Sequence, residues 1–156
     1  MAADRKAVAL VLATAIAVPM EGVRQWAYFD PIGLPTVCMG HTEGVKMGDF
    51  RTLPECRALL TQDMSYAIAI TDACQPGLPT PILAAFSDLT FNAGSTAACD
   101  VAKSTAARYL KLKDYRAACD QLLRWTKARI AGVMVELPGL VKRRAMEREL
   151  CLKGIA

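Results

Sequence analysis

Apolar residues open the chain in an almost unbroken run. Residues 7–20 read AVALVLATAIAVPM, in which Thr14 is the one polar side chain, and Arg5 and Lys6 come just before them. Such a run lacks the polar face of an amphipathic surface helix. As a helix, its fourteen residues extend roughly 21 Å, short of the roughly 30 Å hydrocarbon core of a bilayer. The pattern therefore predicts a helix that is either buried in a core or held only weakly by a membrane.

Four interpretations of residues 1–20 are compatible with this pattern. The basic start, the apolar run and Ala15-Ile16-Ala17 resemble a cleavable secretory signal, and the length also suits a core helix. A permanent anchor requires a longer and more apolar run, whereas a weak anchor, inserted during export and later released, does not. Cleavage after Ala17 would leave only three residues before Glu21. We therefore favour a segment that is retained if Glu21 is functional.

The rest of the chain changes from turns to helices. Glycine and proline are frequent in residues 21–42, which predicts short strands and turns. Residues 49–72 carry apolar side chains at helical spacing, and Thr52 with Glu55 forms a capping box at the start. Further helices are expected at about 81–91, 97–111, 114–127 and 140–153. The pattern predicts an α+β, mostly helical protein with a small mixed N-terminal lobe.

Composition indicates a single domain, and the charged residues are distributed unevenly along the chain. The 156 residues are 53% hydrophobic and 22% charged, which is typical of a folded domain. Residues 103–156 carry 13 Lys and Arg against 5 Asp and Glu, whereas residues 1–102 carry 6 against 10. A basic half favours an anionic polymer, although a solvated helical surface explains it equally well. No aromatic ladder or zinc-finger spacing accompanies the basic residues, so nucleic acid is not expected as a partner.

Six cysteines are many for a cytosolic protein of this size. An even number in a short chain predicts disulfides and an oxidising compartment, but six cysteines allow 15 complete pairings. Cys38-x-x-His41 is half of a zinc motif without its second half, and a Cys/His nucleophile pair would have to use this one histidine. We expect neither a metal nor an organic cofactor.

Three candidate catalytic residues lie in the stretch EGVRQWAYFDPIGLPTVCMGHT, namely Glu21, Asp30 and Thr36. A glycosidase needs a carboxylic acid beside the leaving oxygen and a second group that stabilises positive charge or positions a water. Glu21 is expected at a helix end and Asp30 on a strand or turn, so the two carboxyl groups are suited to opposite sides of one cleft. The hydroxyl of Thr36 is suited to holding the attacking water. From spacing alone, three solvated surface residues are the alternative.

This stretch resembles the active-site signature of the phage lysozyme family, which includes phage T4 lysozyme. The elements EGVR, Y-x-D-P-x-G, T-V-C-x-G-H-T, FNAG and GLVKRR match family landmarks from about residue 20 to residue 152. The resemblance implies a lysozyme-like fold, with a short antiparallel sheet in the N-terminal lobe and a helical C-terminal lobe. The chain is similar in particular to endolysins that begin with a signal-arrest-release segment, a weak anchor that leaves the membrane to activate the enzyme.

The resemblance also implies roles for individual residues. Glu21 would be the general acid, and Asp30 and Thr36 would position the water or stabilise the oxocarbenium-like state. Asn92 would bind sugar in the cleft. The implied reaction is that of a muramidase, which hydrolyses the β-1,4 bond between N-acetylmuramic acid and N-acetylglucosamine in peptidoglycan. A wall-binding module without turnover and a lytic transglycosylase are the alternatives.

Structural residues follow from the same resemblance. His41 would pair with Asp63, and either Arg143 or Arg144 would approach Glu21. The implied disulfides are Cys38–Cys56, Cys74–Cys99 and Cys119–Cys151.

The implied organisation is a weak anchor at residues 1–20, followed by a catalytic domain at residues 21–156. Through residues 7–20 the protein would associate transiently with the periplasmic face of the inner membrane, and a monomer would then be released into the periplasm. Its other partner would be bacterial peptidoglycan. The alternative is a cytosolic endolysin, released by a holin, in which residues 1–20 form an ordinary helix.

Overall fold

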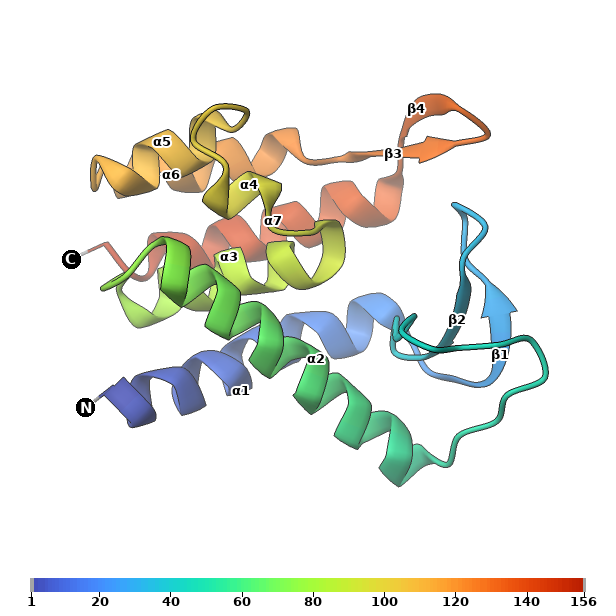
Figure 1. Ribbon diagram of the computed structural model, residues 1–156. Helices are drawn as coiled ribbons and strands as arrows, with labels where there is room; N and C mark the ends of the chain where they lie inside the picture. The colour runs from blue at the N-terminus through green and yellow to red at the C-terminus, as the bar shows by residue number, and fades with distance from the viewer. Residues whose placement is uncertain (1, 156) are drawn as a thin grey trace.

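The apolar N-terminal run forms a helix that belongs to the protein core. The computed structural model describes residues 2–155, and its first element is α1 (Ala2–Glu21). Ala9, Ala13 and Ala17 are buried where α1 packs against α3 (Thr80–Ala93) and α2 (Leu53–Cys74), whereas Val11 is 67% exposed (Figure 1). Across residues 2–155, no helix combines the length and apolar character needed to cross a membrane.

The N-terminal lobe is built on an antiparallel hairpin of β1 (Arg24–Phe29) and β2 (Pro35–Cys38). Tyr28 pairs with Thr36, and a turn after β1 begins at Asp30. A loop then leads to α2, whose start has the expected capping box between Thr52 and Glu55. In Figure 1 this lobe lies at one end of α1, beside the helical body.

The helical body surrounds α3, of which Ile82 to Thr90 are all buried. It continues through short elements to the last helix: α4 (Thr96–Cys99), α5 (Thr105–Lys111), α6 (Tyr115–Gln121), a 3₁₀ turn η1 (Leu122–Arg124), β3 (Lys127–Ile130), β4 (Val133–Glu136) and α7 (Pro138–Leu152).

Two of the expected helices are wrong in their bounds. The helix expected at 97–111 is interrupted after α4, because the Asp100 carboxylate accepts hydrogen bonds from the amides of Ala102 and Lys103 and so stabilises a turn. Ser104 then caps α5. The helix expected at 114–127 ends with η1, and a second antiparallel hairpin, β3–β4, follows in the C-terminal lobe. This hairpin was not predicted.

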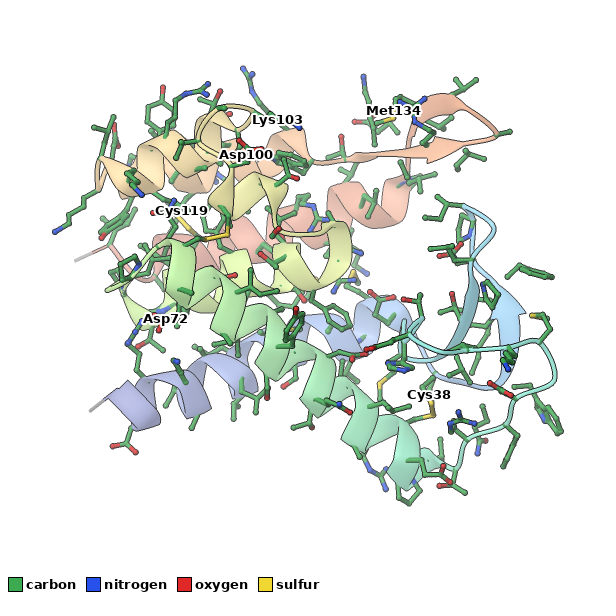
Figure 2. The ribbon with its side chains drawn as sticks, in the orientation of Figure 1. Cys38, Asp72, Asp100, Lys103, Cys119 and Met134 are labelled. Carbon is green, nitrogen blue, oxygen red and sulfur yellow. A yellow bond between two sulfur atoms is a disulfide. The ribbon has the colours of Figure 1, made fainter. Side chains whose placement is uncertain are left out.

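Three disulfides connect the elements, and their pairing is the one implied by the family resemblance. Cys38–Cys56 joins β2 to α2, Cys74–Cys99 joins α2 to α4, and Cys119–Cys151 joins α6 to α7. Figure 2 shows the Cys38 bridge at the base of the hairpin lobe.

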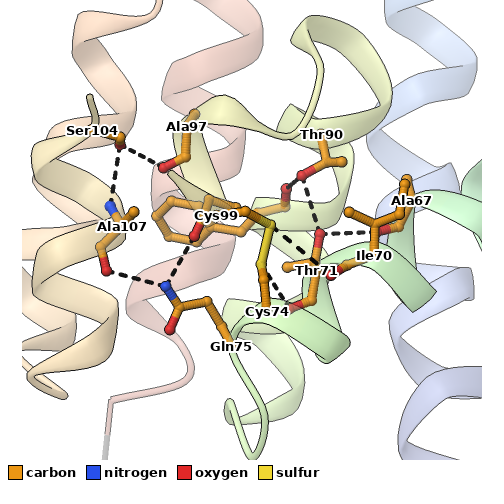
Figure 3. Close-up of a disulfide and its surroundings, with 12 residues drawn as sticks. Ala67, Ile70, Thr71, Cys74, Gln75, Thr90, Ala97, Cys99, Ser104 and Ala107 are labelled. Atoms are coloured by element: carbon orange, nitrogen blue, oxygen red, sulfur yellow. Dashed lines mark hydrogen bonds between the residues drawn. A yellow bond between two sulfur atoms is a disulfide. The ribbon is translucent and has the colours of Figure 1, made fainter. Parts of the chain in front are cut away.

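A buried polar cluster surrounds the second bridge. The Gln75 side chain donates to the carbonyls of Ala98 (2.9 Å) and Ala107 (3.1 Å), and the hydroxyls of Thr71 and Thr90 are 3.1 Å apart (Figure 3). These bonds satisfy groups that would otherwise be buried without partners, and they align α2, α3, α4 and α5.

Candidate active site

Glu21 is the last residue of α1, and its position follows from how the helix ends. Gly22 has a φ of 63°, which lets the chain turn sharply into β1. The Glu21 side chain is 19% exposed and forms an ion pair with Arg143 of α7. A Cβ atom at Gly40 would lie 3.1 Å from the Glu21 Oε2 atom, so a side chain there would crowd the carboxyl group. Because a helix end carries negative partial charge, the Arg143 cation compensates for an acidic residue at this position.

Arg143 is held by a second carboxylate as well. Its Nε and Nη2 atoms each donate to Asp88 of α3 at 2.8 Å, and both side chains are buried. Burial alone would lower the pKa of Arg143, but the hydrogen bonds and charges of Asp88 and Glu21 raise it above its ordinary value. The guanidinium therefore remains charged and fixes the place of the Glu21 carboxyl group.

Arg144 connects a second set of groups to the same region. It donates to the side chains of Glu147 and Asn92, and its Nε atom donates to the carbonyl of Trp125 at 2.8 Å. Burial raises the pKa of Glu147 well above its ordinary value; Asp88 adds to this effect and Arg144 opposes it. Asn92 is thus fixed by its Oδ1 atom at the C-terminal end of α3.

Asp30 and Thr36 lie on the β1–β2 hairpin. The Asp30 Oδ1 atom accepts from the amides of Ile32 (3.0 Å) and Leu34 (2.8 Å), which fixes the carboxylate at the turn. Thr36 is buried, and its hydroxyl donates to the Leu34 carbonyl at 2.9 Å. The candidate catalytic groups on this hairpin are therefore held by the turn between its strands.

The pKa of Tyr28 responds to both candidate carboxyl groups. Burial raises the pKa of Tyr28, and the charges of Glu21 and Asp30 raise it further, although Arg24 opposes them. Both carboxyl groups therefore act on one side chain of β1, which is the neighbour of Thr36 across the hairpin. Glu21 ends the helix that leads directly into the hairpin of Asp30 and Thr36, so the three candidates predicted from sequence lie on adjoining elements.

His41 and Asp63 form the expected pair, with 2.7 Å between Nδ1 and Oδ2. The other ring nitrogen lies 3.0 Å from the Glu43 carbonyl, so the histidine ties the loop after β2 to α2. A cavity of about 300 Å³ opens beside this pair, and its lining includes Gly40 and Phe91. Over the part of the chain that the structure describes, no cluster of His, Cys, Asp or Glu side chains is suited to a metal ion.

Sequence reasoning missed Asp88 and Glu147, the buried carboxyl groups of the site. A signal for Asp88 was available, since it is the one charged residue in the apolar stretch ILAAFSDLTF of α3. Sequence also left open which arginine meets Glu21, and the structure identifies Arg143.

Comparisons with known proteins agree with this geometry. A family model described as phage lysozyme matches residues 18–147. The SAR-endolysin of Enterobacteria phage P21 is 38% identical over 137 residues, which cover 86% of this chain and 79% of that protein. The solved endolysin from Escherichia coli O157:H7 phage FAHEc1 is 28% identical and superposes with a TM-score of 0.77 over 92% of each chain.

The endolysin Lyz of P1 phage provides a comparison of fold in two states. At 22% identity, its active form superposes with a TM-score of 0.78, covering 93% of this chain and 85% of that one. Its secreted inactive form superposes with a TM-score of 0.55, covering 73% and 77%. The fold described here is therefore closer to the active form.

Together, the two-lobed fold and the carboxyl groups at its junction define a lysozyme-type glycoside hydrolase. The chain belongs to the phage lysozyme family, whose model covers most of its length.

Proposed function

We propose that this protein is an endolysin that hydrolyses the β-1,4 linkage between N-acetylmuramic acid and N-acetylglucosamine in bacterial peptidoglycan, and so lyses the host cell. Relatives over most of the chain are named endolysins and SAR-endolysins. The observation that carries the proposal is the Glu21 carboxyl group, held by Arg143 at a helix end and near the hairpin of Asp30 and Thr36.

In this mechanism Glu21 is the general acid. It gives its proton to the glycosidic oxygen as the bond from that oxygen to the anomeric carbon breaks. Asp30 and Thr36 stabilise the oxocarbenium-like state or position the water that adds to the anomeric carbon. Asp30 suits this role because its Oδ1 atom is already fixed by two amides, so the carboxylate needs little reorganisation. The proton that this water loses passes to a carboxylate of the site, either Asp30 or the Glu21 that the first step leaves ionised.

Asp88 keeps the charge of Arg143 compensated when Glu21 carries its proton. A general acid must carry its proton before it acts. If Glu21 were the only partner of Arg143, its protonation would leave the Arg143 cation buried and uncompensated. Here Arg143 keeps two hydrogen bonds to the Asp88 carboxylate whatever the charge of Glu21. We therefore assign Asp88 as a positioning residue.

Asn92 is the proposed sugar-binding residue. Arg144 engages its Oδ1 atom, which fixes the orientation of the amide. The Nδ2 group is then the one suited to donate to a sugar oxygen.

Product analysis tests the reaction. Digestion of purified peptidoglycan should release fragments with reducing muramic acid ends, identified by mass spectrometry. Anhydro-muramic ends would mean a lytic transglycosylase, and wall binding without release would mean a module without turnover. Either result would refute the proposed hydrolysis.

We propose further that residues 7–20 insert transiently into the inner membrane during export, and that a monomer is then released into the periplasm. Several relatives are named SAR-endolysins, and all six cysteines form disulfides, as expected in an oxidising compartment. In this scheme residues 1–20 direct insertion into the membrane, and residues 21–156 form the catalytic part. After release, α1 supports Glu21 from within the core.

Making the exposed face of α1 more apolar should delay release. Ala7 and Ala15 are exposed in the folded protein, so the Ala7→Leu/Ala15→Leu variant strengthens membrane insertion while leaving the buried face unchanged. We expect more protein in the membrane fraction and later lysis than with Ala58→Leu, an exposed control on α2.

Lysis at the same time as the control would contradict the membrane step. It would favour the second candidate, a cytosolic endolysin released by a holin. The packing of α1 in the core also suits that candidate. Free thiols in protein from intact cells would support it.

A further inference from the structure

The β3–β4 hairpin of the C-terminal lobe has no role in the mechanism above. Its strands pair from Lys127 with Glu136 to Ile130 with Val133, and the two hairpins of the described chain form separate sheets. Every β4 side chain is exposed, including Val133 at 62% and Val135 at 38%. An isolated two-stranded hairpin is marginally stable in water, so one that leaves apolar side chains exposed suggests a binding surface.

The two faces of this hairpin differ in chemistry. Side chains alternate along a strand, and directly paired residues share a face. One face, here called the inner face, is entirely apolar and consists of Ala128, Ile130, Val133 and Val135. The outer face consists of Lys127, Arg129, Met134 and Glu136.

The β3–β4 hairpin lies at the same end of the molecule as the β1–β2 hairpin (Figure 1). The turn of the β1–β2 hairpin leaves Ile32 and Leu34 54% and 48% exposed. Both hairpins therefore present exposed apolar side chains at the end of the molecule where the two lobes meet.

The base of the hairpin is fixed to the site residues. Thr126 and Leu137 close it with an amide-to-carbonyl hydrogen bond of 3.0 Å. Arg144 holds the adjacent Trp125 carbonyl with one nitrogen and Asn92 with another. The tip is a tight turn, with Ala131 at a φ of 50° and Gly132 at 81°. A short, firmly based hairpin of this kind provides a stable wall.

We infer that the inner face of the β3–β4 hairpin binds the glycan strand of peptidoglycan as the C-terminal wall of the substrate groove. This inference rests on the proposed function. The inner face is uncharged, so its chemistry matches the acetamido methyl groups and the C–H faces of the sugar rings and not the charged stem peptides. With the exposed apolar residues of the β1–β2 turn, it would hold the strand from both lobes.

Binding to purified sacculi at 4 °C tests this inference in the Glu21→Gln background. The Val133→Ser/Val135→Ser variant removes apolar contacts from the inner face. The matched control, Met134→Ser, changes an exposed residue of the same strand on the outer face. We expect the apparent Kd to rise about fivefold or more for the inner-face variant and less than about twofold for the control.

Three results would overturn the inference. The apparent Kd could rise equally for both variants, or it could rise for neither. It could also rise for the inner-face variant on intact sacculi but not on sacculi whose stem peptides an amidase has removed. The last would identify the peptides as the ligand. Thermal unfolding of each variant shows whether the protein as a whole stays folded. Soluble sugar released by the Glu21→Gln protein would refute the proposed acid, and the binding comparison would remain valid on a glycan analogue whose glycosidic bonds cannot be hydrolysed.

Discussion

Arg143 donates hydrogen bonds to two carboxyl groups of different burial, and this difference organises the site. Asp88 is fully buried and engages two guanidinium nitrogens, whereas Glu21 is partly exposed and engages one. The buried pair therefore fixes the cation, and the exposed carboxyl group is the one that can meet substrate. Arg144 and Glu147 extend the same cluster toward Asn92.

Glu147→Gln should be at least as stable as the unmodified protein at neutral pH. Burial raises the pKa of Glu147, so the folded state holds this proton more tightly than the unfolded state. The stability of the unmodified protein then decreases as pH rises above the unfolded pKa, whereas glutamine has no proton to lose. Urea unfolding from pH 4 to pH 8 should show a difference that grows in favour of the variant. If the variant instead lost about 3 kcal/mol of unfolding free energy at every pH, Glu147 would be ionised in the folded protein and paired with Arg144.

At the scale of elements, α1 is held at both ends. Glu21 pairs with Arg143 at its C-terminal end. Near its N-terminus, Arg5 donates to Asp72 of α2 at 2.6 Å and to the Leu78 carbonyl at 2.9 Å, and Lys6 lies 3.5 Å from Asp72. The small alanine face between the two ends packs closely but contributes little apolar area per residue. These end contacts therefore matter to the docking of α1.

Asp72→Asn should loosen α1 in a pH-dependent way. Burial alone would raise the pKa of Asp72, but Arg5 and Lys6 lower it below its ordinary value. The ionised carboxylate thus stabilises the fold above the unfolded pKa, and this contribution is lost as pH falls through the folded pKa. We expect the variant to lose about 1 kcal/mol of unfolding free energy at pH 7 and progressively less toward pH 3. A difference that does not vary with pH would contradict this account.

The Cys119–Cys151 bridge should stabilise the folded protein by holding α7 in place. It closes a sequence separation of 32 residues and joins α6 to the helix that carries Arg143. Cys119→Ala/Cys151→Ala should lose about 3 kcal/mol of unfolding free energy in urea, together with part of the activity. A loss below about 1 kcal/mol would mean that packing alone holds α7.

Elements with strong local signals could be predicted from sequence. The capping box at Thr52 and the apolar spacing that follows it predict α2 because both signals are local. The β3–β4 hairpin was missed because its turn has alanine where asparagine or glycine usually signals a hairpin. Asp88 was missed as a site residue because its partners lie far along the chain, on α7. Its apolar neighbours in the sequence indicate a buried charge, but they do not indicate which distant group it pairs with.

At the scale of the whole molecule, the two lobes meet along α1 and at the ion pair between Glu21 and Arg143. One lobe supplies the hairpin of Asp30 and Thr36, and the other supplies Arg143, Asn92 and the β3–β4 hairpin. The excess of basic residues also falls in the C-terminal half. This half would attract an anionic wall polymer, and the attraction would weaken as ionic strength rises.

The most direct test of the account is peptidoglycan clearing by the unmodified protein and by Glu21→Gln, with Glu149→Gln as an exposed carboxyl control on α7. Glutamine keeps the shape of Glu21 and removes its proton. We expect a folded Glu21→Gln protein whose turnover falls by about a thousandfold or more, with normal activity in the control. Clearing by Glu21→Gln at the unmodified rate would contradict this expectation, and would mean that another group protonates the leaving oxygen.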